Sequence, residues 1–241
     1  MPGRFPVNWK ELVEQYKNRD YPLGIYFGSM IGTPRDWFGF EGLCYMIYDN
    51  RPLVEDIIET LCRLSESIAE KILKEVEIDF GMGWEDICYN SGPIISPQLF
   101  HELVTPRYKR ITSILHRHNV DVIWTDCDGD INSIISEFLE GGINCMFPME
   151  VRGGTDPVQI REKYGKQALL LGGVNKIELM KGHKEIEAEL LRLKPTVDQG
   201  GFIPHIDHRC PEDVSLENYK LYLRLKREIL NCGELTPQYK E

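Results

Sequence analysis

The sequence predicts an α/β fold of the (β/α)8 barrel type, with about six strand–helix units present. Short apolar runs alternate with longer segments of helical period, and the runs have the composition of strands buried on both faces. Polar residues cluster directly after nearly every run, as they do at the carboxyl ends of barrel strands. A doubly wound open sheet is the alternative, but no glycine-rich dinucleotide-binding motif follows the first run. We therefore expect residues 1–241 to form a single barrel domain.

Six short apolar runs are the expected strands. Barrel closure needs eight strands, so we interpret the chain as a barrel that lacks its N-terminal part. Exposed sheet edges favour pairing with another chain, which predicts a homodimer. In chain order the runs are Leu23–Phe27, Ile78–Met82, Asp121–Trp124, Ile143–Phe147, Ala168–Leu171 and Gly201–Pro204.

The segments between these runs carry helix-start and helix-stop signals. Ser96, Asp156 and Ser215 are N-cap residues, and Pro106 should interrupt the helix that Ser96 begins. Gly165 is expected to end its helix in the left-handed conformation. The expected helices cover residues 53–75, 97–117 with the interruption, 131–139, 158–164 and a last helix after Ser215.

Composition excludes several functional classes. The chain has 241 residues and a net charge of −10, which does not suit binding to nucleic acid or to an anionic membrane. No apolar run is long enough to cross a bilayer, and the N-terminus has no apolar signal segment. The seven cysteines form no CxxC pair, so we expect reduced thiols in a cytoplasmic protein. Its densest basic cluster, Arg107–Arg110, is expected on a solvated helix face.

Two polar segments stand out as candidate sites. Asp126 and Asp128 leave the third run two residues apart, so they could converge on one cation, with a neighbouring histidine completing the site. Helix capping is the alternative, and it is favoured for Asp130. The last run is followed by His205-Ile206-Asp207-His208-Arg209-Cys210, in which His208 is the better candidate for acid–base chemistry or metal binding. His183 is expected in a solvated turn.

Further carboxylates and glycines follow other runs. Glu85, Asp86 and Glu150 would enlarge an acidic pocket, and mutual repulsion would raise the pKa of at least one of them. Capping or a rim position is an equal alternative for Glu85. Gly172 and Gly173 would let the backbone approach a ligand closely.

Several motifs together resemble the uroporphyrinogen decarboxylase superfamily, over about Phe5 to Leu230. They are Asn90-Ser91-Gly92-Pro93 with Ile95-Ser96-Pro97, Asp126-x-Asp128-Gly129, Gly172-Gly173-Val174-Asn175-Lys176, and Asp207-His208-Arg209-x-Pro211-x-Asp213-Val214-Ser215-x-Glu217-Asn218-Tyr219. The last motif is the most specific.

The resemblance implies a (β/α)8 barrel with one of two activities. One is cofactor-free decarboxylation of uroporphyrinogen in haem biosynthesis, and the other is zinc-dependent methyl transfer involving a corrinoid protein. In the zinc enzymes the ligands are a His-x-Cys pair and a distant Cys, which fall on Asp126, Asp128 and His208. Oxygen and nitrogen ligands suit polarisation of an ether or amine methyl donor better than activation of a thiol. The arginine-rich segment that grips the porphyrinogen in the decarboxylases has no match here.

The first hypothesis is therefore a metal-dependent methyltransferase that moves a methyl group between a small methylated substrate and the methylcobamide of a corrinoid-binding protein. Asp126, Asp128 and His208 would bind zinc or another divalent metal. Catalytic roles are expected for Glu150, Asp86 and His208. Two alternatives stay open: a uroporphyrinogen decarboxylase, and a non-catalytic shortened paralogue that acts as a binding module. The residues expected to contact substrate are Glu85, Tyr89, Arg152, Gly173, Asn175 and Arg209.

Overall fold

The structure is a computed structural model that describes residues 6–231 and 233, and it divides into two compact units. Unit 1 runs up to Ile87 and includes Pro93–Asp126 and Ser133–Cys145. Unit 2 comprises Cys88–Gly92, Cys127–Asn132 and the chain from Met146 onward.

Unit 1 contains three neighbouring parallel strands, in the order β1-β2-β5, and the beginning of β6. The strands are β1 (Gly24–Gly28), β2 (Phe80–Trp84), β5 (Val122–Asp126) and β6 (Cys145–Phe147). Its helices are α1 (Trp9–Lys17), α2 (Gly32–Phe38), α3 (Phe40–Asp49), α4 (Arg51–Ile72), α5 (Pro97–Leu103), α6 (Thr105–Arg117) and α7 (Ile135–Glu140).

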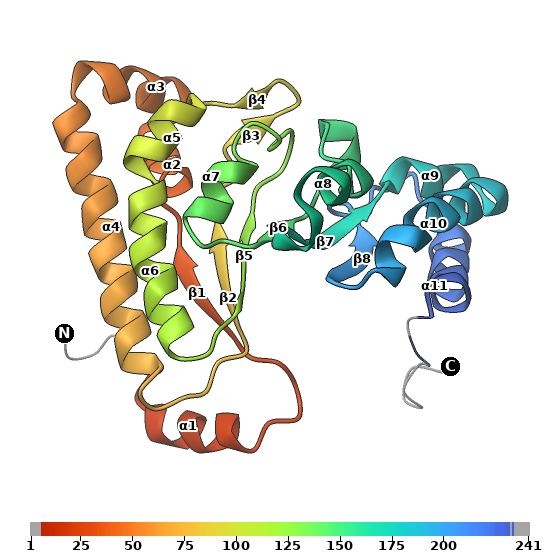
Figure 1. Cartoon of the computed structure of the whole chain (residues 1–241), viewed down its shortest axis with the longest axis horizontal. Helices are drawn as coiled ribbons and strands as arrows, with labels where there is room; N and C mark the ends of the chain where they lie inside the picture. The colour runs from red at the N-terminus through yellow and green to blue at the C-terminus, as the bar shows by residue number, and fades with distance from the viewer. Residues whose placement is uncertain (1–5, 232, 234–241) are drawn as a thin grey trace. The chain divides into compact units, whose positions relative to one another are not determined.

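One face of these strands packs against helices, and the other is less covered. Ile25 and Phe27 of β1 are buried, and α4 packs along β1 and α6 (Figure 1). Tyr26 points to the opposite face, where it is 54% exposed, and aligns with Met82 of β2. The strands are therefore apolar on both faces, as the sequence indicates, but only the helix-facing side is fully buried.

Unit 2 contains the remainder of β6 together with β7 and β8 in that order, of which β7 and β8 are parallel. Helix α10 packs against both strands and against α8, α9 and α11 (Figure 1). A short hairpin, β3–β4, precedes α5. The elements are β3 (Cys88–Tyr89), β4 (Gly92–Pro93), β7 (Leu169–Val174), β8 (Phe202–Ile206), the 3-10 helices η1 (Val151–Gly153) and η2 (Gly165–Gln167), α8 (Pro157–Tyr164), α9 (Lys176–Lys181), α10 (His183–Asp198) and α11 (Leu216–Leu230).

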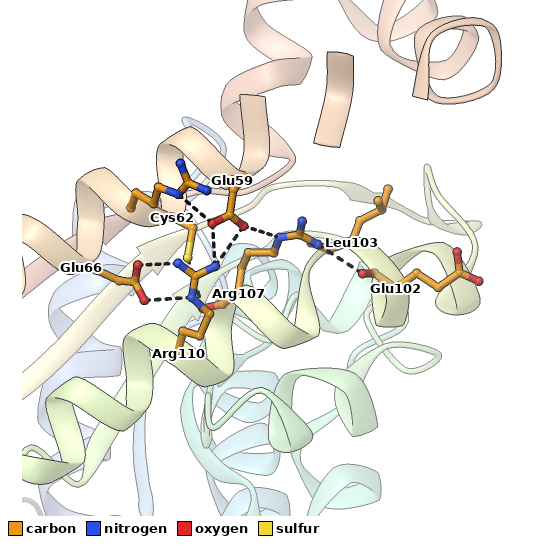
Figure 2. A network of polar contacts seen from close by, with 8 residues as sticks. Glu59, Cys62, Glu66, Glu102, Leu103, Arg107 and Arg110 are labelled. Carbon is orange, nitrogen blue, oxygen red and sulfur yellow. Dashed lines mark hydrogen bonds and ion pairs between the residues drawn. The ribbon is translucent and has the colours of Figure 1, made fainter. Parts of the chain in front are cut away.

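A polar network joins α4 to α6 in unit 1 (Figure 2). Arg110 forms ion pairs with Glu59 (2.8 Å) and Glu66 (2.5 Å), and Arg107 approaches Glu59 at 3.3 Å. Cys62 on α4 is buried beside this network, and burial raises the pKa of its thiol to about 12. The arginines thus face acidic partners on α4 and Tyr108 between them is fully buried, whereas Lys109 is exposed. The expected solvated basic cluster is therefore present only in part.

The six expected strands and the expected α/β fold of barrel type, with six strand–helix repeats among the described residues, are confirmed. Ser96 and Ser215 cap α5 and α11 by accepting the Leu99 and Asn218 amides. The break at Pro106 is also present, because α5 ends at Leu103 and α6 begins at Thr105.

Three local expectations are corrected. The helix expected from Ile131 begins at Ile135, because Asp130 accepts hydrogen bonds from Asn132 instead of capping that helix. His183 is the first residue of α10 rather than part of a turn. Gly165 has a positive φ of 58° but a ψ of −142°, which is not the left-handed helical conformation.

Candidate functional site

The clearest candidate site in unit 2 begins with Asp128 and His208. Asp128 lies in the loop after β5, and His208 lies just after β8. The imidazole Nε2 of His208 is 3.1 Å from Oδ2 of Asp128, and both side chains are about one third exposed. Two of the three expected metal ligands are therefore in contact although 80 positions separate them.

Glu150 and Lys176 form a second pair in the same unit. Their Oε1 and Nζ atoms are 2.7 Å apart, and the Gly129 amide donates to the other oxygen of Glu150 at 3.2 Å. Burial acts to raise the pKa of Glu150, but the hydrogen bond and the charge of Lys176 outweigh it and hold the pKa below its ordinary value. Glu150 is therefore a carboxylate at neutral pH that binds the Lys176 ammonium, and it is not the general acid that mutual repulsion would produce.

Asp207 lies at the centre of these groups. Its side chain is fully buried and accepts the backbone amides of Val151 at 2.9 Å and Lys176 at 3.0 Å. Its own amide donates to the Val174 carbonyl at the end of β7. Burial raises the pKa of Asp207 in spite of these hydrogen bonds.

Unit 1 holds three of the expected site residues, which are Glu85, Asp86 and, at the end of β5, Asp126. The Asp126 carbonyl accepts the amides of Glu85 and Asp86 at 2.8 and 3.2 Å. The Glu85 side chain is fully buried, and its two oxygens accept hydrogen bonds from the Ser29 and Tyr108 hydroxyls and from three backbone amides at the start of α2. Glu85 thus caps α2 from a distance, which is the capping alternative left open by the sequence.

Asp86 pairs with an arginine that sequence reasoning did not single out. Nη1 of Arg35 lies 3.3 Å from Oδ2 of Asp86 and also contacts the Asp86 carbonyl. The guanidinium carbon of Arg35 lies 5.2 Å from the centre of the Trp84 ring, a cation–π contact. Arg35 lies within α2 and does not directly follow a strand in the sequence, so no sequence signal marked it. Lys176, by contrast, ends the Gly172–Lys176 motif and could have been singled out.

The remaining expected residues take simpler positions. Tyr89 on β3, Arg152 in η1 and Arg209 after β8 are exposed. Asn175 caps α9 by accepting the Ile177 amide. The amide of Gly173 donates to the Pro148 carbonyl, so its close backbone approach is to the protein itself.

A cluster of one histidine and two glutamates in unit 1 could hold a metal ion, although the sequence did not indicate it. His101 on α5 lies 2.8 Å from Glu137 and 3.7 Å from Glu140, both on α7. The hydrogen bond that the His101 imidazole donates to Glu137 is the main reason that the pKa of His101 is raised. Because His101 and Glu140 are half exposed, the cluster also has the character of a surface ion pair.

Comparison with known proteins supports the family suggested by the motifs. No curated protein matches the chain. No helix among the described residues is long and apolar enough to cross a membrane. The family model described as "Uroporphyrinogen decarboxylase (URO-D)" matches residues 24–229, a span that contains every candidate site residue named above. With most of its length matched and with six strand–helix repeats, the chain belongs to the uroporphyrinogen decarboxylase family.

Proposed function

We propose that this protein is a metal-dependent methyltransferase that transfers a methyl group between a small methylated substrate and a corrinoid protein. The observation that carries the proposal is the contact between Asp128 and His208. Zinc–oxygen and zinc–nitrogen bonds are about 2.0–2.1 Å long, so two ligand atoms on a tetrahedral ion lie about 3.3 Å apart. The 3.1 Å between Oδ2 and Nε2 fits that separation. Asp126, the third ligand expected from the sequence, belongs to unit 1, so the proposed site rests on Asp128 and His208.

The ion pair of Lys176 favours methyl transfer over decarboxylation. Lys176 is neutralised by Glu150 at 2.7 Å. It therefore offers no unpaired positive charge to a substrate with many carboxylates, which the net charge of −10 would also repel.

In the proposed reaction, a bound divalent metal would polarise the oxygen or nitrogen that releases the methyl group. Asp128 and His208 would hold that metal. The Glu150 carboxylate, kept ionised by Lys176, would orient the methylated substrate. The methyl acceptor would be a reduced cobamide on the partner protein, and a second copy of this chain is a further proposed partner.

Metal analysis of four matched samples tests the proposal. The wild type, Asp128→Ala and His208→Ala are stripped with a chelator, reloaded with zinc and analysed by mass spectrometry. His101→Ala is the matched control, because it removes an exposed histidine from the other cluster that could hold a metal. We expect about one tightly bound zinc ion in the wild type and in His101→Ala, and none in the other two.

A methyl-transfer assay with reduced free cobalamin as acceptor and a panel of methylated amines and ethers as donors completes the test. Zinc-dependent methylation that is lost in His208→Ala supports the proposal. Three results would overturn it: zinc lost in His101→Ala alone, metal-independent turnover of uroporphyrinogen, or tight binding of a corrinoid protein without metal or turnover.

A further inference from the structure

Asp207 is a fully buried carboxylate in unit 2, and its two oxygens accept hydrogen bonds from two different segments. Oδ2 accepts the amide of Val151, which begins η1, and Oδ1 accepts the amide of Lys176, which begins α9. The Asp207 amide is itself fixed to the Val174 carbonyl. One side chain thus joins the segments that follow β6, β7 and β8.

Each joined segment carries one of the candidate site residues. Val151 directly follows Glu150, Lys176 is itself the partner of Glu150, and His208 directly follows Asp207. Consecutive Cα atoms are about 3.8 Å apart, so fixing Asp207 and Val151 leaves little freedom in where Glu150 and His208 can lie. The pairs Glu150–Lys176 and His208–Asp128 consequently depend on the same buried anchor.

An ionisable carboxyl group suits this position better than any neutral side chain of its size. Two converging N–H donors need two acceptor atoms, and an asparagine would point its NH2 group at one of them. A buried N–H left without an acceptor is costly, so the loop that faces the NH2 group would move. Asparagine would therefore detach one of the two loops while leaving volume and burial almost unchanged.

We propose that Asp207 is a positioning residue, which sets His208 against Asp128 and Glu150 against Lys176 through its hydrogen bonds to Val151 and Lys176. The inference rests on the proposed function for its metal-binding consequence. Outer partners of this kind typically change metal affinity by about 10–100-fold when they are mutated.

The test compares Asp207→Asn with Asp156→Asn. Asp156 is the control because it also accepts two backbone amides in unit 2, those of Val158 and Gln159, where it caps α8. Its other oxygen pairs with Arg192 and not with Glu150, Lys176, Asp128 or His208. Zinc affinity is measured by competition with a chromogenic chelator. The imidazole 15N signals of His208, assigned with His208→Gln, report its surroundings in the metal-free protein.

We expect Asp207→Asn to weaken zinc binding at least tenfold and to shift the His208 signals, while Asp156→Asn changes neither. Zinc affinity within twofold of wild type together with unchanged His208 signals would reduce Asp207 to a structural role and overturn the inference. If the wild type binds no zinc, the proposed function fails, and the His208 signals alone decide the positioning role. If Asp207→Asn does not fold, Asp207→Glu keeps both acceptors but lengthens the side chain, and the same two readouts apply.

Discussion

Glu85 offers the sharpest test of how a buried charge organises unit 1. Five donors converge on its carboxylate: the amides of Met30, Ile31 and Gly32, and the hydroxyls of Ser29 and Tyr108. Glu85→Gln keeps the size of the side chain but replaces one acceptor oxygen by an NH2 group. The sequence placed Glu85 among the substrate contacts, whereas this geometry assigns its oxygens to the loop before α2.

The expected loss of stability follows from the hydrogen bonds that glutamine cannot keep. If the NH2 group takes the place of Oε1, the Met30 amide at 2.7 Å loses its acceptor, which costs about 1–3 kcal/mol. The bonds to the other oxygen change from charge-assisted to neutral, which removes roughly 1 kcal/mol each. Relief from burying a charge offsets part of this loss. We expect the free energy of unfolding to fall by about 3 kcal/mol, a large share of the roughly 5–15 kcal/mol that holds a typical protein folded.

Urea unfolding and hydrogen exchange together measure this effect. The midpoint should fall clearly in Glu85→Gln, and the amides of Met30, Ile31 and Gly32 should lose protection. Tyr108→Phe removes one of the five donors and should cost about 1 kcal/mol. Glu55→Gln, a glutamate on α4 whose side chain is 42% exposed, should cost less than about 0.5 kcal/mol. The reasoning is refuted if Glu85→Gln is no more destabilising than Glu55→Gln, or if the three amides keep their protection.

Three further outcomes are expected. Gly172→Ala should destabilise unit 2 in urea unfolding, because φ is +110° there and an added Cβ would lie 2.0 Å from a backbone carbonyl oxygen; a wild-type midpoint would contradict this. Iodoacetamide at pH 8 should alkylate the exposed Cys210 well before the buried Cys62, whose pKa is raised to about 12, as peptide mapping can show; equal rates would oppose the assignment. The hydrogen bond from Arg110 lowers the pKa of Glu59, so this pair contributes stability above the unfolded pKa of about 4.3 and loses it as the pH falls through the lower folded value. Wild-type and Glu59→Gln proteins should therefore differ in urea midpoint at pH 7 and converge in acid, and a constant difference would contradict the account.

Much of the fold follows from local sequence patterns. The apolar run from Ala168 to Leu171 falls on β7, and Ser96 and Ser215 cap the helices they were expected to cap. These features could be predicted because a strand needs a short apolar run and a helix start needs an acceptor for its first amides. The start of α7 could not, because Asp130 and Asn132 bond to each other in place of capping the helix.

The candidate site was only partly predictable for a related reason. Asp128, Glu150 and His208 were recognisable as polar residues after strand ends, which is where a parallel α/β fold gathers its functional groups. That Lys176 holds Glu150 ionised, or that Arg35 reaches Asp86, depends on segments distant in the chain being brought together.

The sequence by itself determined the family, the strand–helix alternation and the strand ends from which the polar residues project, because these depend on residue type and short-range periodicity. Tertiary structure decided what each carboxylate does. Glu85 became a buried cap, Glu150 an ion-paired carboxylate and Asp207 an anchor between loops. The physical reason is that a carboxylate takes its role from its donors and its burial, and both are set by contacts between residues far apart in the chain.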